Sequence, residues 1–242
     1  MRERLPVRVV RAVARVVVPV ACPGCGREDV RWCEACVAAW WEDPWRAEHN
    51  AARLDIVGRP PLPVWVVAPL AGGAHGMIAG WKDGGRRDLD GLFADAAERL
   101  GRRVAPAVAS VPGPWVVVPA PARRASTRRR GEDLPLLLAR AVARGLAQGG
   151  IRADVRPALA IGAGEQRRRS AGDRWRAMRS AVTVQASLPP GSPVLIVDDV
   201  VTTGATLAAC VAALEGVGSP VVAALALAAV ERVAGDAHAG LW

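Results

Sequence analysis

Short apolar runs rich in β-branched residues alternate with longer helical patterns along most of the chain. The apolar runs cover residues 64–69, 115–118, 194–197 and 221–227. The helical patterns cover residues 89–104, 134–146 and 205–217. Strands of this type, separated by helices, pair in parallel and are covered by helices on both faces. The alternation therefore predicts an α/β fold with a parallel sheet, in which ligands bind beyond the carboxyl ends of the strands.

The third apolar run is followed at once by two acids and a threonine-rich turn. Residues 194–207 read Val-Leu-Ile-Val-Asp-Asp-Val-Val-Thr-Thr-Gly-Ala-Thr-Leu. A buried strand would thus deliver Asp198 and Asp199 to its end, and the turn would open a helix. Backbone N–H groups at a helix start converge, and the helix dipole favours an anion there. We expect a phosphate site made by Thr202, Thr203, Gly204, Ala205 and Thr206.

Four of the five cysteines form two Cys-x2-Cys pairs separated by seven residues, namely Cys22, Cys25, Cys33 and Cys36. Each pair can bring two thiolates onto one ion from a tight turn, and this spacing favours tetrahedral Zn(II) in a closed structural site. Two disulfides, which need an oxidising compartment, and an iron–sulfur cluster are the alternatives. A closed zinc site would hold the surrounding residues together rather than catalyse. Cys210 is expected to be a small buried residue of a helix.

The string at residues 194–207 resembles the phosphoribosyl pyrophosphate (PRPP) signature of type I phosphoribosyltransferases. In that family the loop holds the 5-phosphate of PRPP, and the paired acids contact the ribose hydroxyls near a Mg(II) ion. The resemblance implies that Asp198 and Asp199 are catalytic acids and that residues 202–206 bind the 5-phosphate. It also implies that Mg(II) accompanies PRPP.

The order of the other motifs is similar to that of the ComF family, competence-associated proteins that resemble phosphoribosyltransferases. After the cysteine pairs come a lone lysine, Lys82, then Val-Pro-Ala-Pro at residues 118–121 and Arg-Arg-Arg-Gly at residues 128–131. The last motif before the PRPP signature has a regular spacing of four residues and consists of Gln166, Ser170 and Arg174. The similarity implies a type I phosphoribosyltransferase-like sheet with flanking helices, preceded by a small zinc-ribbon-like module.

A cluster of prolines at residues 59–63 favours extended backbone and indicates a boundary between domains. Together with the resemblance, it divides the chain into three parts. These are an N-terminal helix and tetracysteine module at residues 1–45, a linker at residues 46–63 and a phosphoribosyltransferase-like domain at residues 64–242. The helix is expected because arginines recur at helical spacing over residues 4–15. A cleaved lipoprotein-type leader is disfavoured because arginines interrupt its apolar stretch.

Transfer of a phosphoribosyl group from PRPP develops positive charge on the ribose and negative charge on the departing pyrophosphate. Carboxylates suit the first charge, and guanidinium or ammonium groups suit the second. We therefore expect Lys82, Arg128 and Arg130 to bind the pyrophosphate. The alternative for each arginine is a solvated surface charge. No motif identifies the acceptor.

Residues 162–179 are rich in basic residues and poor in apolar ones. We expect them to form a hood over the site that includes Gln166, Ser170 and Arg174, because excluding water suppresses hydrolysis. The alternative is a strip that binds nucleic acid. Trp175 stands beside Arg174 in the sequence, and basic residues interleaved with aromatic ones are typical of such surfaces.

The chain is strongly basic, with 32 Lys and Arg against 23 Asp and Glu and a net charge of +9. Codon bias toward G+C-rich codons and an anionic partner both explain an arginine excess. The motifs favour PRPP and an unknown acceptor as partners of an enzyme. The alternative is a non-catalytic protein that binds PRPP, a nucleotide or single-stranded DNA and assists the competence machinery in DNA uptake, or acts in DNA repair.

No membrane span is expected. The longest apolar run before the first cysteine covers residues 16–21, and a spanning helix needs roughly 20 apolar residues. We expect a cytoplasmic protein.

Overall fold

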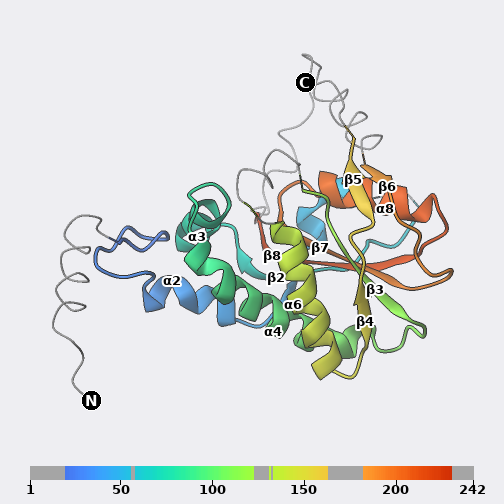
Figure 1. Cartoon of the computed structure of the whole chain (residues 1–242), viewed down its shortest axis with the longest axis horizontal. Helices are drawn as coiled ribbons and strands as arrows, with labels where there is room; N and C mark the ends of the chain where they lie inside the picture. The colour runs from blue at the N-terminus through green and yellow to red at the C-terminus, as the bar shows by residue number, and fades with distance from the viewer. Residues whose placement is uncertain (1–19, 56–57, 123–130, 132, 163–181, 231–242) are drawn as a thin grey trace, which may run out of the picture.

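The computed structural model describes residues 20–55, 58–122, 131, 133–162 and 182–230, and Figure 1 shows how its elements are arranged. A six-stranded sheet has the strand order β1-β2-β8-β7-β3-β4. Neighbouring strands are parallel except β1, which is antiparallel to β2. The strands of this sheet are β1 (Trp45–Arg46), β2 (Val64–Pro69), β3 (Trp115–Pro119), β4 (Ala153–Val155), β7 (Val194–Val201) and β8 (Val221–Ala229). A separate antiparallel pair consists of β5 (Leu159–Ile161) and β6 (Val182–Val184).

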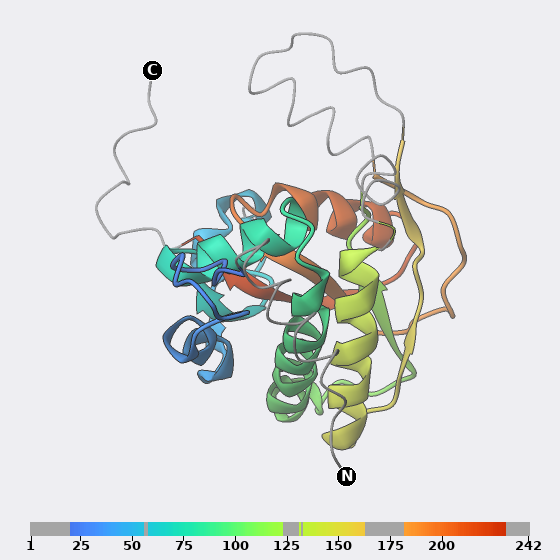
Figure 2. The same ribbon diagram turned by 60° about the vertical axis from the view of Figure 1, so that its left-hand side comes forward.

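Helices cover both faces of the six-stranded sheet. The described α-helices are α2 (Glu34–Ala38), α3 (Gly72–Lys82), α4 (Asp90–Val108), α6 (Leu134–Gln148) and α8 (Ala205–Glu215). The 3-10 helices are η1 (Ala39–Trp41), η2 (Glu48–Asn50), η3 (Ala52–Leu54) and η4 (Arg87–Leu89). Figure 2 shows α8 on the opposite side of the strands from α4 and α6. The predicted α/β fold with a parallel sheet and flanking helices is confirmed.

The core has two layers because side chains of a strand alternate between its faces. Leu195 and Val197 of β7 belong to the cluster that also contains the buried residues of α3, α4 and α6. Val194 and Ile196 belong to the cluster that contains the buried residues of α8. The central strands are therefore apolar on both faces, which explains their continuous runs of β-branched residues.

Strand β7 is longer than its apolar run. The sequence predicted a strand over residues 194–197 with the two acids at its end, but β7 continues to Val201, so Asp198 and Asp199 lie within it. That expectation was wrong because β8 pairs with β7 beyond the apolar run, with Asp198 opposite Ala226 and Val200 opposite Ala228. The neighbouring strand satisfies backbone groups whatever the side chains are.

Helix α3 was not predicted, because glycines weaken a helical pattern. Gly72, Gly73, Gly76 and Gly80 all lie in it. Burial of one face compensates, and its buried residues are Ala74, Met77, Ile78 and Trp81. Tertiary packing therefore decides the conformation of this segment.

The described part of residues 46–63 packs onto the sheet. Strand β1 pairs along the edge of β2, and Ala47 and Ala51 are fully buried in the α8-side core. The three-part division of the chain stays a prediction. The expected N-terminal helix lies outside the described residues.

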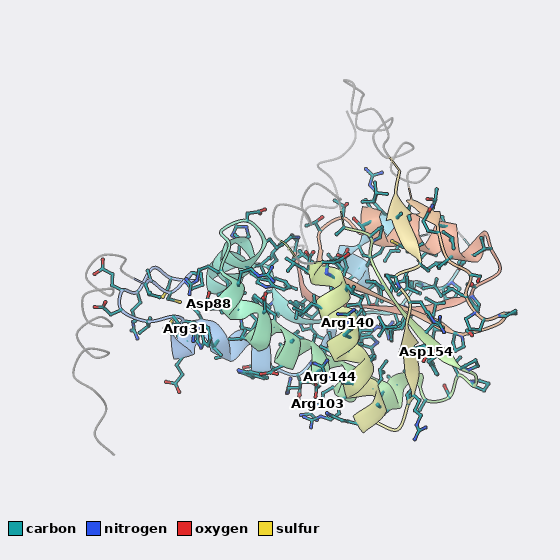
Figure 3. All side chains as sticks on the ribbon, viewed as in Figure 1. Arg31, Asp88, Arg103, Arg140, Arg144 and Asp154 are labelled. Carbon is teal, nitrogen blue, oxygen red and sulfur yellow. The ribbon has the colours of Figure 1, made fainter. Side chains whose placement is uncertain are left out.

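Several arginines on α4 and α6 take part in surface ion pairs, and Figure 3 labels two of them, Arg103 and Arg144. The Arg144 Nε lies 2.7 Å from an oxygen of Glu98, and an Arg103 nitrogen lies 3.0 Å from an oxygen of Asp43. Among the helices that the structure describes, none is both long enough and apolar enough to cross a membrane.

Candidate functional site

A lysine and an acid meet near the carboxyl end of β7. Lys82 is the last residue of α3, and its Nζ lies 2.8 Å from both carboxylate oxygens of Asp199. The Asp199 side chain is only 11% exposed, so the pair is shielded from water more than an ordinary surface ion pair. The structure thus brings together two residues that are 117 positions apart in the sequence.

The second acid, Asp198, has a different environment. It neighbours Asp199 on the same strand, so the two side chains leave β7 on opposite faces. Asp198 accepts a hydrogen bond of 2.8 Å from the backbone N–H of Asp199. Burial, and secondly the charge of Asp199, raise the pKa of Asp198 from 3.8 to about 8. Asp198 is therefore largely protonated at neutral pH in the free protein.

The Asp198 side chain lies on the side of the sheet that α8 covers. Burial, and secondly the charge of Asp198, raise the pKa of the Cys210 thiol in α8. Cys210 is fully buried, as the sequence predicted. The two adjacent acids thus divide between the two layers of the core.

The turn after β7 forms an open cradle at the start of α8. Gly204 precedes the helix with a φ of +75°, a left-handed conformation that favours glycine. The N–H groups of the first helical turn have no partners within the helix. Thr202 and Thr203 are exposed, and Ala205 and Thr206 are partly exposed. Donors and helix dipole together suit this turn to bind a phosphate.

A segment far away in the sequence braces this cradle. The backbone N–H of Arg53 donates a 3.1 Å hydrogen bond to the carbonyl oxygen of Thr203. Ala51 packs against Gly204 so closely that a Cβ on the glycine would lie 2.8 Å from the Cβ of Ala51. Sequence reasoning missed this contact because residues 46–63 were interpreted as a linker.

A cavity of about 1380 Å³ lies between this bracing segment and α8. Thr202 and Thr203 line one part of it, and Arg59 and Glu215 form an ion pair of 2.7 Å in its wall. The lining residues include neither Lys82 nor the two acids. The cavity therefore flanks the cradle and is separate from the Lys82–Asp199 pair.

Asp133 is a further acid near the site that sequence reasoning did not single out. Its side chain caps α6 by accepting a 3.2 Å hydrogen bond from the N–H of Leu136. Burial raises the pKa of Asp133, and the charge of Asp199 adds to this effect, while the Leu136 N–H opposes it. An Asp directly before Leu-Pro is a helix-start signal that the sequence contains.

The four cysteines of the two Cys-x2-Cys pairs form one cluster. Their sulfur atoms all lie within 4.8 Å of one another. The Sγ of Cys33 lies 3.8 Å from that of Cys22 and 3.5 Å from that of Cys25. In a tetrahedral site with Zn–S bonds of about 2.3 Å, neighbouring sulfurs are roughly 3.8 Å apart. The cluster therefore has the size that one tetrahedral ion requires, and these separations exceed an S–S bond.

The pKa values of two of these thiols, Cys22 and Cys33, are lowered, which favours their thiolate form. Burial acts to raise the pKa of Cys22, but hydrogen bonds from the backbone of Cys33, Cys25 and Gly24 outweigh it and lower the pKa to about 6. A backbone hydrogen bond from Cys36 lowers the pKa of Cys33, whereas burial raises the pKa of Cys36 itself. A cation would compensate the charge that burial disfavours on Cys36.

Five predicted site residues lie outside the described part of the chain. They are Arg128, Arg130, Gln166, Ser170 and Arg174. On either side of the expected hood, β5 and β6 pair with each other, with Ile161 opposite Val182. The pyrophosphate and hood assignments stay predictions.

Comparison with known proteins supports the interpretation of the β7–α8 region. Residues 136–238, which are less than half of the chain, match the family described as the phosphoribosyl transferase domain. This match includes the acids and the cradle. No curated protein sequence matches the chain.

Two solved structures are similar to part of the chain. One is an adenine phosphoribosyltransferase from Saccharomyces cerevisiae in complex with D-2,5-dideoxy-2,5-imino-altritol 1,6-bisphosphate and adenine. It is 18% identical with a TM-score of 0.37, and the alignment covers 58% of this chain and 69% of that one. Another adenine phosphoribosyltransferase is 17% identical with a TM-score of 0.38, and the alignment covers 58% and 71% of the two chains. The matched residues 136–238 contain β7, the two acids and the cradle just described, so this part of the chain is similar to a phosphoribosyl transferase domain.

Proposed function

We propose that the protein binds PRPP with Mg(II) and transfers its phosphoribosyl group to an acceptor, releasing pyrophosphate. The observation that carries this proposal is the cradle with its glycine turn at the start of α8, which begins three residues after Asp199, the acid that is paired with Lys82. A phosphate in the cradle would place the attached ribose next to the carboxyl end of β7. The proposal covers the substrate and reaction class, and the acceptor is unspecified.

In the proposed reaction the bond between ribose C1 and the pyrophosphate oxygen breaks, and the acceptor nucleophile forms the new bond to C1. Positive charge on the ribose is stabilised by the carboxylate of Asp199, with Asp198 ionising as the substrate binds. Lys82 is proposed to leave Asp199 and bind the departing pyrophosphate. Arg128 and Arg130 are proposed as further pyrophosphate ligands, because a guanidinium fork matches phosphate oxygens. Bound Mg(II) would neutralise charge on the substrate oxygens.

Gln166, Ser170 and Arg174 are proposed to lie in a hood that excludes water from the site. Hydrolysis competes with transfer whenever water reaches C1, so such a cover would favour the acceptor. Their spacing and their place in the chain, between the paired strands β5 and β6, support this role.

The cysteine cluster is proposed to hold one structural Zn(II). Four thiolates fill the coordination sphere and leave no open position for substrate. Cysteines that serve as metal ligands are typical of reducing compartments, which supports a cytoplasmic location. This module, followed in order by Lys82 and the β7–α8 signature, also supports membership of the ComF type.

A second candidate role follows from that resemblance. The protein would bind PRPP, a nucleotide or single-stranded DNA without turnover, in DNA uptake together with competence proteins or in DNA repair. The basic residues in the segment between β5 and β6 support it, since phosphate contacts dominate the affinity for nucleic acids.

Calorimetry with PRPP, with and without Mg(II), tests the proposal directly. We expect saturable Mg(II)-dependent binding that the double substitution Asp198→Asn/Asp199→Asn abolishes. The matched control is Asp154→Asn on the edge strand β4, whose side chain is 71% exposed and whose position Figure 3 marks. If the unaltered protein does not bind PRPP, the proposed function is wrong.

Turnover is measured as pyrophosphate release from PRPP with a panel of bases and amines. Release with one acceptor class identifies the enzyme and its substrate. Binding of PRPP without release, together with salt-sensitive binding of single-stranded DNA, would favour the second role.

A further inference from the structure

The cysteine cluster is seated directly on the helix that carries Lys82. Figure 1 shows the cysteine-bearing segment alongside α3. Gly73, Gly76 and Gly80 lie three and four residues apart, so they share one face of α3. A Cβ on Gly73 would lie 2.8 Å from the Sγ of Cys36, and one on Gly76 would lie 2.5 Å from the carbonyl oxygen of Pro23. There is no room between the cysteine-bearing segment and α3 for even one methyl group at Gly73 or Gly76.

The opposite side of this contact is equally tight. A Cβ on Gly24 would lie 2.7 Å from the Sγ of Cys36 and 2.8 Å from the carbonyl oxygen of Gly73. A Cβ on Gly80 would lie 2.9 Å from the Cβ of Pro23. Residues within the first Cys-x2-Cys turn therefore touch α3 along two turns of the helix.

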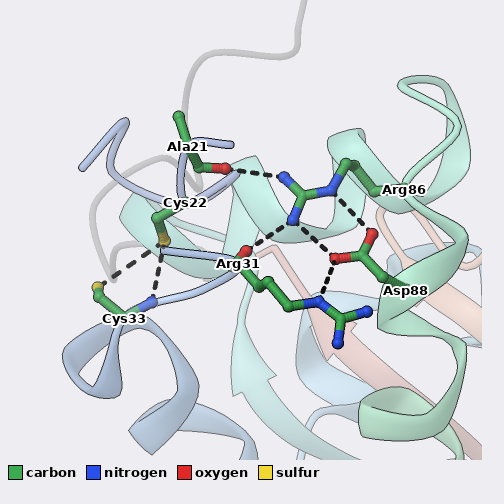
Figure 4. A network of polar contacts seen from close by, with 6 residues as sticks. All are labelled: Ala21, Cys22, Arg31, Cys33, Arg86 and Asp88. Atoms are coloured by element: carbon green, nitrogen blue, oxygen red, sulfur yellow. Dashed lines mark hydrogen bonds and ion pairs between the residues drawn. The ribbon is translucent and has the colours of Figure 1, made fainter. Parts of the chain in front are cut away.

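Arg86, in the turn that follows Lys82, forms hydrogen bonds to residues beside both Cys-x2-Cys pairs, as Figure 4 shows. Its guanidinium donates to the carbonyl oxygen of Ala21 at 2.8 Å and to that of Arg31 at 2.6 Å. Asp88 orients this guanidinium through two hydrogen bonds of 2.8 Å. Ala21 directly precedes Cys22, and Arg31 lies two residues before Cys33, so one arginine fixes both cysteine pairs.

An aromatic cluster fixes the remaining side of α3. The Nε1 of Trp40 lies 3.2 Å from the sulfur of Met77, and its ring lies 4.9 Å from that of Phe93. The ring centroid of Trp81, next to Lys82, lies 4.6 Å from that of Phe93. The Nε1 of Trp81 donates a 2.7 Å hydrogen bond to Asp90. The helix is thus held between the cysteine segment and α4.

Helix α3 depends on these contacts because its glycines give it little intrinsic helix stability. A metal ion would join four sulfurs that come from a turn at Cys22 and Cys25 and from the start of α2 at Cys33 and Cys36. Its binding energy would therefore stabilise the surface on which α3 rests. We propose that the metal-bound cysteine module is a positioning element that holds Lys82 against Asp199 and so maintains the anion site. The part of this inference that concerns PRPP depends on the proposed function.

The first test uses Lys82 as its own reporter, because it is the single lysine of the chain. The rate of its acetylation by a succinimidyl ester is followed by mass spectrometry of the modified peptide. We expect Gly76→Ala, which pushes Pro23 away from α3, to raise this rate several-fold, as should removal of the metal by a chelator. The matched control is Gly91→Ala in α4, where a Cβ meets nothing within 4 Å and the rate should not change.

Circular dichroism establishes that each variant is folded. If Gly76→Ala does not fold, Gly80→Ala replaces it, because its Cβ would meet only side-chain atoms of Pro23 and Arg86. The inference would be overturned if the folded Gly76→Ala or Gly80→Ala variant and the metal-free protein both keep the wild-type acetylation rate of Lys82.

The second test is a double-mutant cycle on PRPP affinity. We expect Gly76→Ala, or Gly80→Ala in its place, to weaken PRPP binding by roughly tenfold, a typical size for coupling between sites. In a Lys82→Ala background the same substitution should have no further effect on PRPP affinity. Equal losses in both backgrounds would mean that the module does not act through Lys82. If the unaltered protein does not bind PRPP, the proposed function fails, whereas the acetylation test still decides whether the module positions Lys82.

Discussion

The two walls of the candidate site are built in opposite ways. The α8 wall is local, since one continuous stretch supplies the strand, the turn and the helix start that would bind a phosphate. The α3 wall is assembled, since Lys82 reaches Asp199 from a helix that rests on the cysteine segment and on α4. A local wall depends on backbone conformation, and an assembled wall depends on packing between distant segments.

The two acids show the same contrast within one strand. Asp199 faces the assembled wall and has an ammonium partner, whereas Asp198 faces the α8 layer and is held mainly in its neutral form. Side chains at adjacent positions on a strand point to opposite faces of the sheet, so two acids that are neighbours in the sequence lie in environments with different charge and burial.

The largest effect should come from breaking the local wall at its backbone. Gly204→Ala forces a left-handed conformation on a residue with a Cβ, which costs about 1–2 kcal/mol, and that Cβ would press on Ala51. We expect PRPP affinity to fall by at least about tenfold, as measured by calorimetry. The matched control is Gly150→Ala, which shares a positive φ of +89° but has open space around it. It should lose stability and keep its PRPP affinity; equal affinities in the two variants would contradict the local-wall interpretation.

An intermediate effect should come from the pH dependence of stability that Asp198 causes. Between about pH 5 and 7 the unfolded chain has released the Asp198 proton while the folded protein retains it, because the pKa is 3.8 in the unfolded chain and about 8 in the folded protein. The unfolded state then binds fewer protons, so the free energy of unfolding falls as pH rises, by at most about 1.4 kcal/mol per pH unit.

Asp198→Asn removes this dependence and should be more stable than the wild type, with a gain that grows from pH 5.5 to pH 8. Urea unfolding at several pH values measures it. For the control Asp154→Asn, at an exposed position, the free energy of unfolding should change with pH as it does for the wild type. Parallel curves for Asp198→Asn as well would show that Asp198 is ionised in the folded protein.

The smallest effect concerns the helix cap beside the assembled wall. Asp133→Ala removes the acceptor for the Leu136 N–H and should cost about 1 kcal/mol of stability. Asp133→Asn keeps a capping oxygen but removes a charge that lies near Asp199, so its stability should stay close to that of the wild type. Thermal unfolding of the two variants compares them; an equal loss in both would mean that charge, and not capping, is what matters there.

The sequence was most informative where structure is local. The strand at residues 64–69 coincides with β2, and the start of α8 at Ala205 was predicted because the Thr-Thr-Gly turn marks it. It was less informative where neighbours complete an element. The ends of β7 and the existence of α3 depend on β8 and on the cysteine segment, which no local pattern encodes.

The candidate site divides in the same way. Spacing alone brought the four cysteines together as a candidate metal site and placed both acids before a phosphate cradle. No sequence pattern indicated that Lys82 pairs with Asp199 or that Ala51 packs against Gly204. Nor did any pattern indicate that Arg86 forms hydrogen bonds beside both cysteine pairs.

By itself the sequence determined the α/β class, the glycine turn before α8 and the cysteine cluster, because periodicity, turn chemistry and ligand spacing act over a few residues. Only the tertiary structure decided which acid has a cationic partner, which is buried neutral, and which helix carries the lysine to its place. Those outcomes depend on which layer each strand residue faces and on close contacts between segments distant in the chain, and burial and charge are properties of that packing.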